Sequence, residues 1–216
     1  MSSDAVVFIV DDDDAVRASL ELLMSSEDLP VVACRGGQDF LERCGDDPSG
    51  CALMDLHMPG MNGLEVQQEM ARRGVCLPII FLTGHGSVQT TVQAMRAGAI
   101  DFLEKPYSSD ILLARVHEAL ACEQQWRAER ERFNDFEARL AALTPRETEI
   151  LEFVSRGTAS KVIAVELDIS ERTVELHRAR VMKKLRCRTL GALMNDFADY
   201  RQYIAAKQPG VTPDGE

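Results

Sequence analysis

The sequence has no long apolar stretch: no run approaches the roughly 20 residues that a membrane-spanning helix needs. Residues 1–10 contain neither a basic segment nor a long apolar core, so we expect no secretory signal peptide. The six cysteines form no C-x-x-C pair, and several lie inside apolar runs, where a reduced thiol acts as a small hydrophobic group. These absences predict a protein of the reducing cytoplasm that does not contact a membrane.

Charge is distributed unevenly along the chain. The 216 residues are enough for two modest domains, and the 45% hydrophobic content is ordinary for a globular protein. Residues 1–140 carry 12 Lys and Arg against 24 Asp and Glu, whereas residues 141–216 carry 12 against 11. Within residues 171–188, seven basic residues accompany only two acidic ones. An acidic part joined to a part with a basic stripe suggests two domains with different partners, although such a stripe can also be a solvated face.

Short apolar runs alternate with longer amphipathic segments in the N-terminal part of the chain. This alternation is typical of βαβ units around a buried parallel sheet. The predicted strands lie near 6–10, 31–34, 51–54, 78–82 and 101–104. The predicted helices lie near 14–26, 37–44, 64–73, 87–97 and from 110 onward. Five such units predict one doubly wound α/β domain with a five-stranded parallel sheet.

Charged and hydroxyl side chains follow four of these strands. Asp11 and Asp12 come after the first strand, Asp55 after the third, Thr83 after the fourth and Lys105 after the fifth. Ligands bind such a sheet in the crevice outside the carboxyl ends of its strands, so we expect these five side chains to converge. Three carboxylates, a hydroxyl and an ammonium together suit a divalent cation and a phosphoryl group.

The chemistry of this group favours Mg²⁺ and an aspartyl phosphate. Mg²⁺ prefers oxygen ligands and keeps several waters, so two or three carboxylates are enough. The predicted ligands are Asp11, Asp12, Asp55 and the backbone carbonyl of His57. Asp55 would act as the nucleophile, Lys105 would pair with the phosphoryl oxygens, and Thr83 would donate a hydrogen bond to one of them. Taken singly, each residue has a plainer reading: Asp13 or Asp14, for example, is expected to cap the following helix.

Four motifs in this part resemble those of two-component receiver domains, and they cover residues 5–120 in order. The motifs are Val10-Asp11-Asp12, Met54 to Gly63, Leu82 to Gly86 and Ala97 to Pro106. The resemblance implies that a histidine kinase phosphorylates Asp55 and that the bond before Pro106 is cis. It also implies a relay in which Thr83 moves toward the phosphoryl group and Phe102 turns inward, altering the surface near 87–107. Many relatives carry Tyr where this chain has Phe102, so a relay that needs the hydroxyl is not expected here.

The C-terminal part begins with a strong helix start. Thr144 is the predicted N-cap, Pro145 the first helical residue, and Glu147 the second half of a capping box. This first predicted helix ends at Gly157. A second spans Ser160 to Leu167, and a third spans Glu171 to Leu185. The last two flank the three-residue break 168–170, which fits a helix-turn-helix.

The last of these helices has two distinct faces. Val174, Val181 and Leu185 form the predicted core stripe, and His177 near it is read as a packing residue. The opposite face holds Arg172, Leu176, Ala179 and Lys183, flanked by Glu175 and Arg180. Such a mixture suits a DNA major groove, because Arg and Lys reach phosphates, Leu and Ala contact a thymine methyl, and Glu accepts from cytosine N4. An amphipathic helix that contacts protein is the alternative.

This part resembles a LuxR-type four-helix DNA-binding domain. The matching motifs are Leu143 to Glu147, Ser160 to Ala164, Ile169 to Val174 and His177 to Arg180. Taken together with the receiver motifs, these sequence motifs are most similar to those of the FixJ-like branch of the FixJ/NarL response regulators. The resemblance implies Lys161, Arg172, Thr173 and Lys183 near phosphates and Glu175, Leu176 and Ala179 at bases. Glu175 replaces the Lys of some relatives, so their DNA sites do not transfer to this chain.

The predicted organisation is a receiver domain at 1–121, a helical linker at 122–142, an all-α helix-turn-helix domain at 143–206 and a flexible tail at 207–216. The linker carries a short heptad-like apolar stripe: Trp126, Phe133, Phe136, Leu140 and Leu143. This stripe is either a dimer seam or a surface that packs on one of the domains.

The sequence thus predicts a cytoplasmic response regulator, not an enzyme, that a sensor histidine kinase phosphorylates on Asp55. Phosphorylation would promote a homodimer that binds double-stranded promoter DNA and regulates transcription, with activation expected and RNA polymerase a further candidate partner. One alternative is a Mg²⁺-dependent phosphatase or phosphotransferase with an aspartyl intermediate. The other is a regulator that works without phosphorylation.

Overall fold

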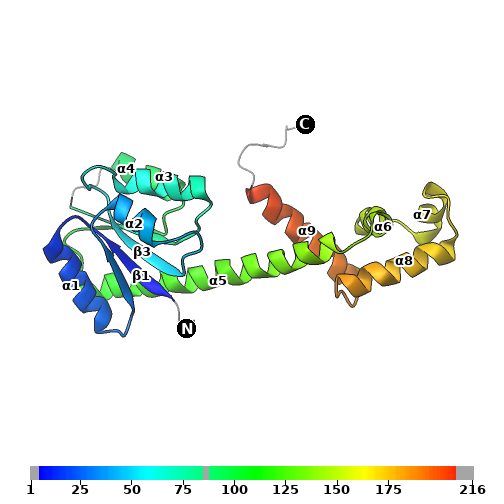
Figure 1. Cartoon of the computed structure of the whole chain (residues 1–216), viewed down its shortest axis with the longest axis horizontal. Coiled ribbons are helices and arrows are strands. Elements are labelled where there is room, and N and C mark those ends of the chain that lie inside the picture. Colours follow the sequence, from blue (N-terminus) through cyan, green and yellow to red (C-terminus); the bar gives the residue numbers. More distant parts are fainter. Residues whose placement is uncertain (1–4, 85–87, 208–216) are drawn as a thin grey trace. The chain divides into compact units, whose positions relative to one another are not determined.

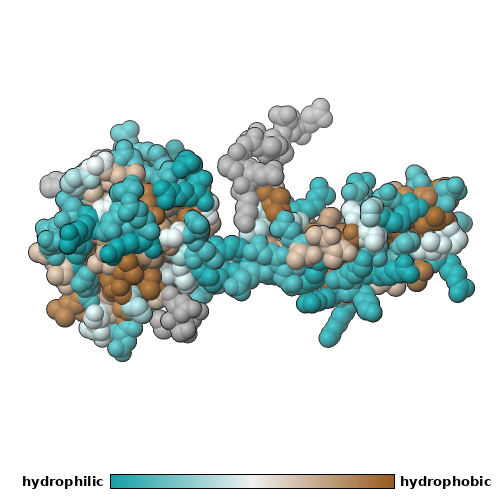
Figure 2. Space-filling model, in the orientation of Figure 1, coloured by the Kyte–Doolittle hydropathy of each residue, from teal (hydrophilic) through white to brown (hydrophobic). Residues whose placement is uncertain are grey.

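The computed structural model describes residues 5–84 and 88–207 and contains two compact units, Met1–Arg127 and Ala128–Glu216 (Figure 1). Within the described residues, no helix is both long enough and apolar enough to span a bilayer. Figure 2 shows that hydrophilic residues cover most of the visible face of each unit, with apolar residues in smaller patches.

The first unit is built on a five-stranded parallel sheet with the strand order β2-β1-β3-β4-β5. The strands are β1 (Val6–Val10), β2 (Val31–Cys34), β3 (Gly50–Asp55), β4 (Ile79–Thr83) and β5 (Asp101–Glu104). This is the doubly wound arrangement that the sequence predicts, and each predicted strand is confirmed within about one residue at either end. The central strand β3 is buried along its whole length, which explains its uninterrupted apolar run.

Helices cover both faces of this sheet (Figure 1). They are α1 (Asp14–Ser25), α2 (Gly37–Arg43), α3 (Gly63–Arg73), α4 (Val88–Arg96) and the first part of α5 (Ser109–Ala141). Alternate strand residues point to opposite faces, so Val7 and Ile9 pack with α1 and α5, whereas Phe8 and Val10 pack with α2, α3 and α4. Burial of each such side chain stabilises the fold by about 1.5–3 kcal/mol.

Local signals set the helix ends. The carboxylate of Asp13 accepts from the backbone N–H of Ala15 at 2.8 Å and caps α1, which confirms the expectation that Asp13 or Asp14 is an N-cap. Asn62 and Glu65 form a reciprocal capping box at the start of α3. The first residue of the helix predicted at 87–97 lies outside the described residues, as do His85 and Gly86 of the Thr-Gly-His-Gly motif.

The second unit is entirely helical. It contains the end of α5, then α6 (Pro145–Ser155), α7 (Ser160–Glu166), α8 (Glu171–Lys184) and α9 (Leu190–Lys207). Its buried core is Ile150, Leu151, Val154, Ile163, Val174, Val181, Leu185 and Leu193. The predicted capping box of Thr144 and Glu147 and the helix-turn-helix of α7 and α8 are confirmed. Helix α9 ends at Lys207, and the rest of the tail predicted at 207–216 lies outside the described residues.

The apolar stripe of the linker contributes to the second unit. Phe133 and Phe136 are buried, and their rings contact Tyr200 and Tyr203 of α9. Leu140 and Leu143 pack on the core of the same unit, whereas Trp126 belongs to the first unit and is 38% exposed. Of the two alternatives for this stripe, packing on a domain therefore occurs for four of its five residues, and a seam between copies stays a prediction.

Candidate functional site

Two aspartates lie side by side at the carboxyl edge of the sheet. Val10 of β1 is the register partner of Met54 of β3, so the next residues along the two strands, Asp11 and Asp55, are neighbours. Both side chains are buried, with Asp11 3% and Asp55 8% exposed. Buried carboxylates are rare unless they are paired or serve a chemical purpose.

Lys105 joins the two carboxylates. Its Nζ lies 3.0 Å from Oδ2 of Asp11 and 3.2 Å from Oδ1 of Asp55. The backbone of the same residue is tied to β4, because its N–H donates to the carbonyl oxygen of Thr83 at 2.7 Å. The peptide bond between Lys105 and Pro106 is cis, as the resemblance to receiver domains implies. The structure thus brings together residues that are up to 94 positions apart in the chain.

The pocket contains more negative than positive charge. Burial raises the pKa of Asp55, and the Asp11 charge adds to that rise against the opposing effects of Lys105 and the His57 N–H, which donates to Oδ2 of Asp55 at 3.0 Å. Burial also lowers the pKa of Lys105, but its bonds and charge interactions with the two aspartates outweigh burial and leave that pKa raised. The ammonium therefore remains charged, and one ammonium only partly offsets two buried carboxylates.

The donor set fits a hard cation that keeps waters. Asp11 and Asp55 offer carboxylate oxygens, and Oδ1 of Asp11 is oriented by the N–H of Asp13 at 2.9 Å. Asp12 is exposed next to them, and His57 follows Asp55 on the same loop. Over residues 5–84 and 88–207, no three His, Cys, Asp or Glu side chains are grouped closely enough to hold a metal by themselves. A cation here would need backbone and water oxygens as well, which is how Mg²⁺ is usually bound.

The side chains of Thr83 and Phe102 point to the same face of the sheet. Phe81 and Phe102 are register partners on β4 and β5, and Thr83 lies two residues after Phe81, so all three side chains point the same way. Thr83 is fully buried, whereas Phe102 is half-buried with its ring centre 6.5 Å from that of Phe81. This face is covered in part by α4, through Ala94. Thr83, Phe81 and Phe102 therefore share the face of the sheet that α4 covers in part.

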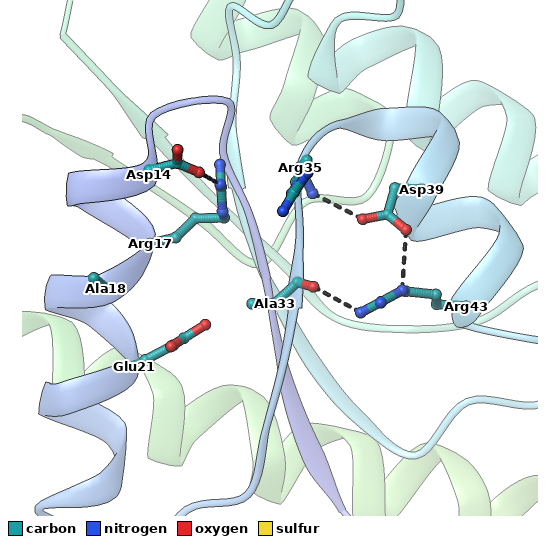
Figure 3. Close-up of a pocket in the computed structure, with 8 residues that line it drawn as sticks. All are labelled: Asp14, Arg17, Ala18, Glu21, Ala33, Arg35, Asp39 and Arg43. Carbon is teal, nitrogen blue, oxygen red and sulfur yellow. Dashed lines mark hydrogen bonds and ion pairs between the residues drawn. The ribbon is translucent and has the colours of Figure 1, made fainter.

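Arg17 is a residue of this site that sequence reasoning missed. It lines a charged cleft of about 590 Å³ between α1, β2 and α2 (Figure 3). Its side chain is only 8% exposed, pairs with Asp14, and donates from Nη1 to the backbone carbonyl of Asp11 at 2.6 Å. It thereby fixes the loop that carries Asp11 and Asp12. Its spacing from Leu20 and Met24, three and seven residues on, was the available signal, because it places Arg17 on the buried stripe of α1.

The predicted DNA face of α8 is open to solvent. Arg172, Glu175, Leu176, Ala179, Arg180 and Lys183 are exposed on α8, as is Lys161 on α7. Leu176 is 52% exposed on this face. Thr173 is half-buried, and its hydroxyl lies 2.7 Å from that of Ser170, the N-cap of α8. The core stripe of Val174, Val181 and Leu185 is buried as predicted, and His177 is half-buried.

An ion pair fixes the orientation of α8 on α6. Nζ of Lys184 lies 2.6 Å from Oε2 of Glu147, the same carboxylate oxygen that accepts from the backbone N–H of Thr144 at 2.8 Å. The hydrogen bond from Lys184, followed by that from Thr144, lowers the pKa of Glu147 to about 2. Because Glu147 is buried, this pair anchors α8 at the end opposite to its N-cap.

Comparison with known proteins places each of the two parts of the chain in a known domain family. Residues 7–117 match the response regulator receiver domain, and residues 141–195 match the luxR family of bacterial regulatory proteins. Nodulation protein W of Bradyrhizobium diazoefficiens is 38% identical over 89% of this chain and 85% of its own length. The transcriptional regulatory protein FixJ of the same organism is 37% identical over 90% of this chain and 95% of its own length.

A solved structure of the response regulator StyR is 38% identical, covers 92% of this chain and all of its own, and has a TM-score of 0.78. These matches cover both units, so the similarity extends over the complete two-domain arrangement and not over one domain alone. The chain therefore belongs to the two-component response regulators that join a receiver domain to a LuxR-type DNA-binding domain, on the FixJ-like branch.

Proposed function

We propose that this protein is a transcription regulator that is switched by phosphorylation of Asp55. The observation that carries the proposal is the meeting of Asp11, Asp55 and Lys105 in one buried pocket on a chain that also presents an exposed helix-turn-helix. Its relatives are transcriptional regulators, which are not enzymes, and we extend that reading to this chain. A cytoplasmic location and activation of transcription belong to the same proposal.

The chemistry follows from the surroundings of Asp55. A carboxylate oxygen of Asp55 attacks the phosphorus of a phosphohistidine, so that an O–P bond forms while the N–P bond breaks and the electron pair returns to the imidazole nitrogen. Lys105, which contacts Oδ1 of Asp55, would pair with the oxygens of the transferred group, and Thr83 would donate a hydrogen bond to one of them. Receiver domains generally bind Mg²⁺, which supplies positive charge for the transfer. We assign its binding to Asp11, Asp12, Asp55 and the carbonyl of His57.

A cleft beside Lys105 suits the sensor histidine kinase that donates the phosphoryl group. This cleft of about 420 Å³ lies between α1 and the loop that leads into α5. Its lining is Ala15, Val16, Ser19, Leu20, Leu23, Lys105, Tyr107 and Ser109. Small and apolar side chains of α1 would accept the face of a kinase helix while its phosphohistidine approaches Asp55.

Helix α4 is suited to carry the switch. Ala94 is its only fully buried residue among Val88–Arg96, and Nε2 of Gln67 on α3 donates to the carbonyl of Ala94 at 3.3 Å. Val88, Val92 and Met95, at helical spacing, are 83%, 43% and 43% exposed. We propose that the Thr83–Phe102 relay shifts this loosely packed helix and that its apolar stripe then meets a second copy of the chain. A differential stabilisation of a few kcal/mol is enough for such a shift.

The second unit would then bind DNA. Helix α8 would enter the major groove, and a dimer would place two such helices on two half-sites. We assign phosphate contacts to Lys161, Arg172, Thr173, Arg180 and Lys183, and base contacts to Glu175, Leu176 and Ala179. Because the whole chain carries a net charge of −11, binding would rely on this local basic surface and fall steeply as salt is raised. The domain limits 1–121, 122–142 and 143–206 remain part of the proposal.

The test compares wild type with Asp55→Asn and with the control Asp28→Asn, which changes an exposed aspartate in a turn. Each protein is treated with a small phosphodonor and Mg²⁺, and its dimer fraction and affinity for selected promoter DNA are measured. We expect phosphodonor treatment to raise the dimer fraction and the DNA affinity of wild type and of the control. Neither quantity should rise in Asp55→Asn. Equal gains in all three proteins would refute the proposal, and turnover of phosphate esters would favour an enzyme instead.

A further inference from the structure

One buried hydroxyl links the two helices of the helix-turn-helix. Ser160 is the first residue of α7 and is buried against α8. Its Oγ donates to Oε1 of Glu175, and it accepts from Nη1 of Arg178 at 2.8 Å. Arg178, Ser160 and Glu175 thus form a short chain of hydrogen bonds in which each donor has one acceptor.

The position of Glu175 indicates that these hydrogen bonds affect DNA recognition as well as helix packing. Glu175 is exposed on α8 next to Leu176 and four residues before Ala179, on the face assigned to the groove. A carboxylate that approaches DNA is repelled by the phosphates, and a mobile glutamate would turn away from them. The hydroxyl of Ser160 holds Oε1, and the positive charge of Arg178 lies behind that hydroxyl. Together they fix the direction in which Oε2 is presented and offset part of the repulsion.

The chemistry of a fixed carboxylate selects a base. A carboxylate only accepts hydrogen bonds, and in the major groove cytosine offers the N4 amino group as a donor. Guanine presents the O6 and N7 acceptors and thymine presents O4, so both are repelled, while adenine offers a donor beside an acceptor. A carboxylate held in one direction therefore favours cytosine over the other three bases.

We infer that Ser160 is a positioning residue that aims Glu175 at a cytosine and so sets part of the sequence preference of α8. The inference rests on the proposed DNA-binding function and adds to it the identity of one preferred base. The hydrogen bonds of Ser160 also join α7 to α8, and a residue that served only to join them would support every DNA contact equally.

The experiment selects binding sites from a duplex pool of random sequence with the full-length protein after phosphodonor treatment. Four proteins are compared: wild type, Ser160→Ala, Ser160→Thr and Glu175→Gln. Thermal unfolding of each protein is recorded in parallel. The strength of each base preference is read position by position from the selected sites, so no knowledge of the natural promoter is needed.

We expect wild type to select a cytosine at one position of each half-site. Ser160→Ala should weaken that single preference about 5- to 10-fold, at the low end of the range for loss of one good base contact. Ser160→Thr keeps the hydroxyl and should keep the preference. Glu175→Gln should move the preference from cytosine toward adenine, because an amide both donates and accepts.

Three results would overturn the inference. Ser160→Ala could retain the wild-type preference, or it could weaken all positions equally together with a lower melting temperature, which is the behaviour of a joining residue alone. Glu175→Gln could leave the cytosine preference unchanged, a result that does not depend on whether Ser160→Ala folds. Failure of wild type to select any sequence would instead refute the DNA-binding proposal, and the inference would fall with it.

Discussion

Replacing Phe133 with alanine should destabilise the second unit although the residue belongs to the segment predicted as a linker. Phe133 is 4% exposed, and its ring is stacked on Tyr203 with the centres 4.3 Å apart and near Tyr200 at 6.3 Å. Next to it, Arg132 pairs with Asp199 at 3.1 Å. The end of α5 is therefore part of the packing of α9 and not a free connection.

The size of the effect follows from the lost packing. Truncation of a buried Phe to Ala costs 3–5 kcal/mol in a large core, and we expect about 2–4 kcal/mol at the edge of this small unit. A unit of this length has a total stability of roughly 5–10 kcal/mol, so the change is a large fraction of it. The matched control is Trp126→Ala on the same helix, which changes an aromatic residue that belongs to the first unit and should leave the stability of the second unit unchanged.

Hydrogen exchange measured by mass spectrometry separates the two units in the intact protein. Peptides from α9 should lose protection by about 30- to 1,000-fold in Phe133→Ala, which is the predicted free energy expressed as an equilibrium constant. Peptides from α1 should not change. The reasoning is refuted if α9 keeps its protection while only the dimer fraction falls, because the stripe would then serve as a seam between copies.

Two further predictions concern the stability of each unit. The pKa of Glu147 is held at about 2, below its ordinary value of 4.5, so its stabilisation is complete above about pH 4.5 and is lost as the pH falls toward 2. Calorimetry should show a melting temperature of the second unit that falls less between pH 5 and pH 3 in Glu147→Gln than in wild type. In the first unit, Gly50→Ala should cost at least about 3 kcal/mol, because Gly50 has a φ of +126° and a Cβ there would lie 1.8 Å from the carbonyl oxygen of Val6. Gly45→Ala, also at positive φ but with open space, should cost about 1 kcal/mol, and equal urea midpoints for the two variants would contradict this argument.

The sheet and its acidic pocket could be predicted because both depend on local patterns and a fixed topology. The apolar runs of the strands end at Asp11, Asp55 and Lys105, and a parallel sheet brings the carboxyl ends of its strands to one edge. No long-range pairing had to be guessed beyond the alternation of strands and helices. The capping box of Thr144 and Glu147 was equally accessible, since both partners lie within one turn.

The missed features are side-chain contacts whose partners no local sequence pattern specifies. Arg17 and Ser160 are polar residues on buried faces, and nothing in their neighbouring residues tells which backbone carbonyl or carboxylate they bond. The stripe around Phe133 has the spacing of a helix face, but spacing alone does not reveal whether α9 or another chain covers it. The roles assigned on α8 stay predictions for the same reason, because the groups they would contact lie outside the chain.

The most direct test of the account is to locate the phosphoryl group on the chain. The protein is treated with phosphodonor and Mg²⁺, reduced with borohydride to convert any aspartyl phosphate into homoserine, digested, and sequenced by mass spectrometry. We predict homoserine at position 55 alone, and less of it in Lys105→Ala at matched short times, because that variant lacks the ammonium that would pair with the transferred phosphoryl oxygens. Homoserine at another aspartate, or increased DNA affinity without any homoserine, would contradict the central claim.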